Sequence, residues 1–179
     1  MSNNLQCPYC AYEFEAAPKK SRKCPQCQKY IHRIKGHKKG AIHLLSEEDY
    51  RRKEQINANK RWIVLSKQVE EFSKDGDWQS LSQVYFQMAL HLYKEGKEFF
   101  HVLQESARFQ LLSFRELDIK RVHISVVGCS ACMKQKDRIV SIEEALKEMP
   151  IPCKDCTTKI KGPASKIGWC RCTYITVRD

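Results

Sequence analysis

Ten cysteines dominate the chemistry available to this chain of 179 residues. Eight form Cys-x-x-Cys pairs, and the other two form Cys170-Arg171-Cys172. Two residues between cysteines allow both sulfurs to face one ion, and four thiolates complete a tetrahedral zinc site. The first residues lack the basic and apolar segments of a secretory signal. We therefore expect a cytoplasmic protein whose cysteines bind metal and are not paired in disulfides.

The N-terminal cysteines form two Cys-Pro-x-Cys turns. The predicted zinc ligands are Cys7, Cys10, Cys24 and Cys27. Over residues 5–35 this pattern resembles the zinc-ribbon family, which implies two knuckles on short β-hairpins and indicates no particular activity. A second partition of the ligands is Cys24, Cys27, His32 and His37. It resembles the zinc knuckle of nucleic-acid-binding proteins, with a histidine where that family has its last cysteine, and it leaves Cys7 and Cys10 without a role.

The six C-terminal cysteines allow more than one metal site. The simplest set for a single zinc is Cys129, Cys132, Cys153 and Cys156. A set that includes Cys170 and Cys172, or a two-metal cluster in which all six thiolates bind with bridging sulfurs, also fits the spacing. We predict at least two zinc ions per chain, and we expect them to be structural because all-cysteine sites leave no open position. The order of these motifs resembles the C-terminal tail of tailed-phage head-morphogenesis proteins, which implies a phage or bacterial origin.

A long basic segment surrounds the second N-terminal cysteine pair. No acidic residue occurs from Ala16 to Ser46, and the net charge of the whole chain is +11. The nine basic residues are Lys19, Lys20, Arg22, Lys23, Lys29, Arg33, Lys35, Lys38 and Lys39. Tyr30 lies among them. Basic side chains of one sign with an interleaved aromatic residue are typical of a polyanion-binding surface, so we predict that this segment binds nucleic acid.

The middle of the chain, which contains no cysteine, is expected to be helical. Ser46 followed by acidic residues predicts a helix start, and Gly76, Asp77 and Gly96 predict the borders of two further helices. Apolar residues recur at spacings of three and four in both later helices. The pair resembles one tetratricopeptide hairpin. Because a single hairpin cannot bury its apolar face alone, we expect an internal core or a protein partner on this region.

Short strands and a short helix are expected around the C-terminal cysteines. Residues 122–127, 138–140 and 175–177 are rich in β-branched residues, and Ser141 begins a capping box for a helix that ends near Met149. The predicted fold class is therefore α+β. The predicted segments are a basic zinc ribbon (1–45), a helical region (46–121) and a Cys-rich zinc module (122–179).

Catalytic motifs are missing from the sequence. It contains no Gly-rich phosphate loop, no Gly-x-Ser-x-Gly and no His-Glu-x-x-His. No stretch approaches the ~20 apolar residues of a membrane span. We predict a non-catalytic adaptor or regulator that binds nucleic acid through the ribbon and a protein through the helices, with no membrane or small-molecule substrate. The alternatives are a phage or bacterial protein-interaction factor without nucleic-acid contact, and a zinc-knuckle nuclease.

Overall fold

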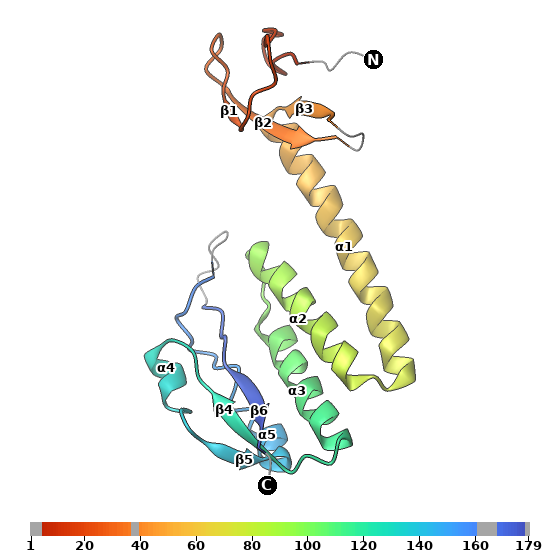
Figure 1. Cartoon of the computed structure of the whole chain (residues 1–179), viewed down its shortest axis with the longest axis vertical. Coiled ribbons are helices and arrows are strands. Elements are labelled where there is room, and N and C mark those ends of the chain that lie inside the picture. The colour runs from red at the N-terminus through yellow and green to blue at the C-terminus, as the bar shows by residue number, and fades with distance from the viewer. Residues whose placement is uncertain (1–4, 37–39, 161–167, 178–179) are drawn as a thin grey trace. The chain divides into compact units, whose positions relative to one another are not determined.

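A computed structural model of the chain describes residues 5–36, 40–160 and 168–177. Its contacts divide the chain into two compact units, Met1–Lys60 and Arg61–Asp179. The described residues form five helices and two three-stranded antiparallel sheets, which confirms the predicted α+β class (Figure 1). The predicted border after residue 45 lies within the first unit, and that after residue 121 lies within the second. The division into three segments stays a prediction.

The N-terminal unit contains a small sheet with the order β1-β2-β3. Its strands are β1 (Arg22–Lys23), β2 (Tyr30–Lys35) and β3 (Ile42–Leu45). Side chains alternate between the two faces of a strand. Ile31 and Leu44 therefore lie on the face that packs against the buried cysteines Cys7 and Cys24. The apolar core of this unit is small, and half of its fully buried members are cysteines.

The first helix, α1 (Glu47–Asp75), begins with the cap that the sequence predicts. The backbone N–H of Asp49 donates to the Ser46 hydroxyl at 3.1 Å, and acidic residues fill the first turn. The backbone N–H of Glu47 donates to the Tyr9 hydroxyl at 2.7 Å. The first cysteine turn is thereby joined to the helix start. Within the second unit, Leu65 of α1 is buried and the Trp62 ring contacts His91.

Two antiparallel helices follow, α2 (Trp78–Lys94) and α3 (Phe100–Glu116). Gly76 and Gly96 have φ angles of +68° and +69°, which glycine adopts readily at the end of a helix. The Asp77 carboxylate accepts a hydrogen bond from the Ser80 N–H at 2.9 Å, and hydrogen bonds from Ser80 lower the pKa of Asp77. The predicted borders of both helices are therefore confirmed. The buried residues of the pair are Leu81, Val84, Ala89, Tyr93, Phe99, Leu103, Ser106 and Leu111.

A reciprocal pair of hydrogen bonds joins α2 to α3. The Ser82 hydroxyl donates to the Ser106 carbonyl at 2.8 Å, and the Ser106 hydroxyl donates to the Ser82 carbonyl at 2.7 Å. Ser106 is buried, so its hydroxyl needs a partner inside the protein. The small serine side chains also permit close approach of the two helices.

The C-terminal sheet has the order β5-β4-β6 and packs against α3 and α5. Its strands are β4 (Arg121–Ser125), β5 (Ile139–Ser141) and β6 (Thr173–Thr176), and the short helices are α4 (Ser130–Met133) and α5 (Ile142–Glu148). Val122 and Ile124 of β4 are fully buried together with Tyr174 of β6. The middle and C-terminal parts of the sequence thus share one apolar core within this unit.

The loop before β6 contributes a second point of attachment to the helices. Trp169 is buried with Tyr93 of α2 and with Phe99, the N-cap residue of α3. Its ring is stacked on Phe99, with 5.4 Å between centroids, and meets Tyr93 edge to face. Because Cys170 follows Trp169 directly, this aromatic contact fixes the position of a cysteine relative to the helices.

The cap of α5 provides a test of local helix stability. The Ser141 hydroxyl accepts a hydrogen bond from the Glu144 N–H at 3.1 Å. Ser141→Ala should lower the free energy of unfolding by ~1 kcal/mol, because this N–H would lose its side-chain partner. Chemical denaturation of the full chain measures the change. The control is Ser130→Ala in α4, where the N-cap is Cys129; equal stability of the two variants would contradict the assignment of this cap.

Among the described residues, no helix combines the length and the apolar character needed to cross a bilayer.

Candidate metal centres

The two N-terminal cysteine turns have the same backbone geometry. In each turn, the N–H of the first cysteine donates to the carbonyl five residues later, in Tyr12 and Lys29. The carbonyl of the first cysteine accepts from the residue four positions later, in Ala11 and Gln28. Ala11 and Gln28 also have nearly equal positive φ angles of 57° and 60°. The structure therefore contains two matching knuckles, as the Cys-Pro-x-Cys repeats predict.

The knuckles bring Cys7, Cys10, Cys24 and Cys27 together into one group of four thiols, called here the ribbon tetrad. The Sγ atoms of Cys7 and Cys27 are 3.8 Å apart, and those of Cys10 and Cys24 are 3.7 Å apart. Four sulfurs around a zinc ion with bonds near ~2.3 Å have edges of about 3.8 Å. The ribbon tetrad therefore has the dimensions of a tetrahedral site that could hold zinc.

His32 lies outside the ribbon tetrad. Its Nε2 atom is 2.6 Å from a carboxylate oxygen of Glu47, and its ring is stacked on Tyr50 at 4.0 Å. The hydrogen bonds from His32 and Arg51 lower the pKa of Glu47. His32 thus joins the sheet to the start of α1, and Cys24 and Cys27 pair with Cys7 and Cys10. This grouping differs from the alternative partition through histidines, whose other member, His37, lies outside the described residues.

The C-terminal thiols gather from three separate stretches of the chain. Cys129 is the N-cap residue of α4, and Cys132 lies within this helix. Cys156 belongs to the loop that follows α5, and Cys170 and Cys172 lead into β6. They form two groups that share one member: Cys129, Cys132 and Cys156, called the first triad, and Cys132, Cys170 and Cys172, called the second triad.

The simplest single-zinc set that the sequence suggests is only partly assembled. Three of its members form the first triad, whereas Cys153 belongs to neither triad. The Cys153 thiol is 3.6 Å from the Pro150 carbonyl, and its backbone N–H donates to Sγ of Cys170 at 3.3 Å. Cys153 therefore lies beside the second triad, on the side of Cys170.

Backbone N–H groups and burial act in opposite directions on these thiols. N–H groups of Thr157 and Cys132 donate to Sγ of Cys129 and lower its pKa to about 6. Such bonds favour the thiolate form that binds metal. Burial raises the pKa of Cys132, which is fully buried. A thiolate at Cys132 therefore needs a nearby positive charge, which a metal ion supplies.

Seven of the nine predicted nucleic-acid-binding residues lie within the described part of the chain. Lys38 and Lys39 fall outside it. Six of the seven are exposed and Arg33 is half-buried; the exposed residues are Lys19, Lys20, Arg22, Lys23, Lys29 and Lys35. None of these seven forms an ion pair with another residue in the described ranges 5–36, 40–160 and 168–177. The Nζ atom of Lys29 lies over the Tyr9 ring, 5.0 Å from the ring centroid.

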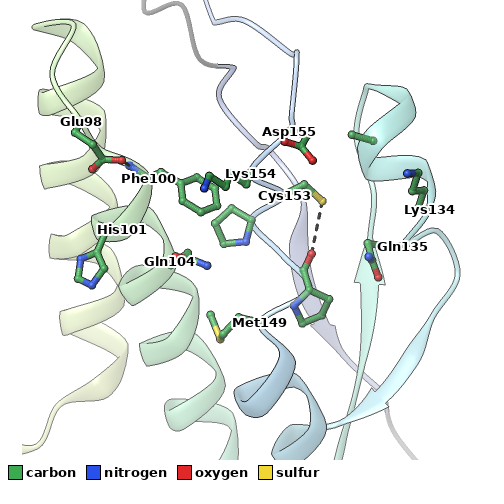
Figure 2. Close-up of a pocket in the computed structure, with 13 residues that line it drawn as sticks. Glu98, Phe100, His101, Gln104, Lys134, Gln135, Met149, Cys153, Lys154 and Asp155 are labelled. Atoms are coloured by element: carbon green, nitrogen blue, oxygen red, sulfur yellow. Dashed lines mark hydrogen bonds between the residues drawn. The ribbon is translucent and has the colours of Figure 1, made fainter.

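A pocket of about 770 Å³ lies beside Cys153, between the start of α3, the turn after α4 and the loop after α5 (Figure 2). Its wall includes Glu98 and Asp155 as well as Lys134 and Lys154. Met149 and Phe100 supply apolar surface. The pocket wall therefore combines charged side chains of both signs with apolar surface.

Sequence reasoning missed three residues that organise these sites. Tyr9 and His32 contact Glu47, which is far from both in the sequence. The Cys-Pro-x-Cys and helix-start motifs indicated a knuckle and a helix near these residues but not the contacts between them. The large side chain of Trp169, directly before the Cys170 motif, was a signal in the sequence that this loop is buried, and Trp169 is buried in the structure. Residue spacing alone carried no information about its aromatic partners.

Comparisons of the chain with protein-family models, with curated proteins and with solved structures give no match. They therefore lend no support to the resemblances to zinc-ribbon, tetratricopeptide and phage head-morphogenesis proteins. The fold and the thiol groups define an α+β protein with cysteine clusters near both ends that could hold zinc.

Proposed function

We propose that this chain is a non-catalytic zinc protein that binds nucleic acid through the β1–β2 surface of its N-terminal unit. The observation that carries the proposal is the cross-strand pair of Lys23 and Tyr30, which lie opposite each other on β1 and β2 and are both exposed. The exposed fraction of Tyr30 is 46%. An aromatic ring beside a lysine can stack on a base while the ammonium group binds a phosphate.

The neighbouring charges support this assignment. Arg22 precedes Lys23 on β1, and Lys19 and Lys20 lie just before the strand. A zinc ion bound by four thiolates has a net charge of −2. The nine basic residues between Ala16 and Ser46 exceed this charge, and no acidic residue of the segment offsets them. The surface should therefore attract polyanions.

The thiol groups support a structural and not a catalytic role for the metal. In the described ranges, the groups of three or more metal-ligating side chains consist of cysteine alone. Sites with four thiolates leave no position for a substrate or an activated water. This chemistry disfavours the zinc-knuckle nuclease, which requires a histidine or carboxylate near the ion.

Binding to DNA and RNA should weaken steeply with salt, and the basic surface should account for the effect. Replacing Lys19, Lys20, Arg22 and Lys23 with glutamine should reduce the magnitude of the log–log salt slope by about 1 for each phosphate contact that is lost. Fluorescence anisotropy with labelled duplex and single strands measures affinity and slope together.

The matched control removes the same charge elsewhere. Lys67, Lys74, Lys94 and Lys147 are exposed residues of the second unit. Glutamine at these positions should leave affinity nearly unchanged. Equal losses in both variants would show non-specific charge attraction and would contradict a defined surface on the ribbon.

The second candidate is a protein-interaction factor without nucleic-acid contact, and the pocket beside Cys153 favours it, because its wall has charged side chains of both signs beside apolar surface. In a chain that binds nucleic acid, the same pocket is the proposed site for a protein partner. The absence of binding to any duplex or single strand at low salt would select the protein-interaction factor.

A further inference from the structure

The arrangement of the two triads limits how many metal ions the C-terminal thiols can hold. Sγ of Cys132 is 3.5 Å from Sγ of Cys129 and 3.8 Å from Sγ of Cys170. Sγ of Cys129 is also 3.7 Å from Sγ of Cys156. These distances match the edge of about 3.8 Å in a tetrahedral zinc–thiolate site. Each triad therefore corresponds to one face of such a tetrahedron.

A single ion does not account for both faces. Within the described residues, the C-terminal thiols form no group of four whose members all lie within 4.8 Å of one another, unlike the ribbon tetrad. One tetrahedral ion requires such a group. Two faces that share a corner instead correspond to two neighbouring tetrahedra with a common vertex at Cys132.

We infer that the C-terminal cysteines hold two zinc ions, with the Cys132 thiolate bound to both. Two tetrahedral ions have eight coordination positions, which six thiolates fill only when two thiolates are shared. The geometry assigns Cys132 as one of these two shared thiolates, because it alone belongs to both triads, and the second shared thiolate comes from the other five cysteines. Cys153, which lies beside Cys170, completes the set of six.

Charge and burial agree with two ions. Six thiolates around one zinc ion would have a net charge of −4, whereas two zinc ions reduce it to the −2 of an ordinary four-thiolate site. Cys132, Cys156 and Cys170 are all buried. Uncompensated negative charge at buried positions is costly, so the second ion stabilises the fully ionised cluster. A single ion would leave two cysteines as neutral thiols.

Native mass spectrometry of the full chain counts the ions directly. The unmodified protein should carry three zinc ions, one in the ribbon tetrad and two in the C-terminal cluster. Cys132→Ser should lose both C-terminal ions, whereas Cys156→Ser, which alters one triad only, should lose one. The matched control, Cys24→Ser, should lose only the ribbon ion. Two ions in the unmodified protein, or equal losses from Cys132→Ser and Cys156→Ser, would overturn the inference.

A second measurement needs no substitution, and so it holds even if Cys132→Ser fails to fold. After exchange of zinc for cadmium-113, a thiolate shared by two ions transmits scalar coupling between the two cadmium nuclei. The spectrum should contain one uncoupled resonance from the ribbon and two mutually coupled resonances from the cluster. Three uncoupled resonances would exclude a shared thiolate, and bound iron with visible charge-transfer absorption would exclude a zinc cluster.

Discussion

Removal of zinc should unfold the N-terminal sheet and its knuckles while α2 and α3 stay helical. Structural zinc contributes roughly 10–16 kcal/mol of apparent binding free energy in small modules, and this energy is coupled to folding. The buried apolar cluster of the unit comprises Cys7, Cys24, Ile31 and Leu44, so two of its four members are proposed ligands. Without the ion, too little apolar surface is buried to offset the entropy of ordering the chain.

Hydrogen exchange of the reduced, chelator-treated chain measures this effect residue by residue. The N–H groups of Cys7, Ala11, Cys24 and Gln28, which are hydrogen-bonded within the knuckles, should lose protection. The N–H groups of α2 should keep theirs, and added zinc should restore the pattern. Cys24→Ser in the presence of zinc should reproduce the loss in the knuckles alone. Protected knuckle amides in metal-free protein would contradict a structural role for the ion.

Trp169→Ala should lower the free energy of unfolding of the second unit by ~3–5 kcal/mol, the range for removal of a buried large aromatic side chain. The ring is 3% exposed and contacts Phe86, Tyr93 and Phe99. Because Cys170 is the next residue, the same substitution should also weaken metal binding by the second triad. Denaturant unfolding and the zinc content of the purified protein are the two measurements.

Two other substitutions serve as controls for this prediction. Trp169→Phe keeps an aromatic ring in the cluster and should retain most of the stability. Trp78→Ala removes a half-buried ring that is stacked on Phe109 and should cost less than Trp169→Ala. A loss of stability at Trp169 no larger than at Trp78 would show that the loop is not anchored by its tryptophan.

Local signals in the sequence predicted much of this fold. Gly76, Asp77 and Ser141 mark helix borders through interactions within a few residues, and the structure has the ends and caps that they predict. Cys-Pro-x-Cys repeats likewise predict knuckles, because a knuckle is formed by consecutive residues. Fold class followed from these local elements.

The arrangement of the C-terminal thiols could not be predicted in the same way. Spacing shows which cysteines lie together along the chain, but the triads join thiols from α4, the loop after α5 and the loop before β6. Their assembly depends on the core formed by β4, β6 and α5 and on the insertion of Trp169. The shared position of Cys132 is therefore a property of the tertiary structure.

The reciprocal serine bonds between α2 and α3 make the helix pair intolerant of sliding. A displacement of one helix by a turn would break both hydrogen bonds between Ser82 and Ser106, and an unpaired hydroxyl at the buried Ser106 costs roughly 1–3 kcal/mol. Hydrophobic side chains alone would accept several alignments with similar packing. The serines thus favour one alignment of α2 and α3. The stacking of Phe99, at the start of α3, on Trp169 depends on the same alignment.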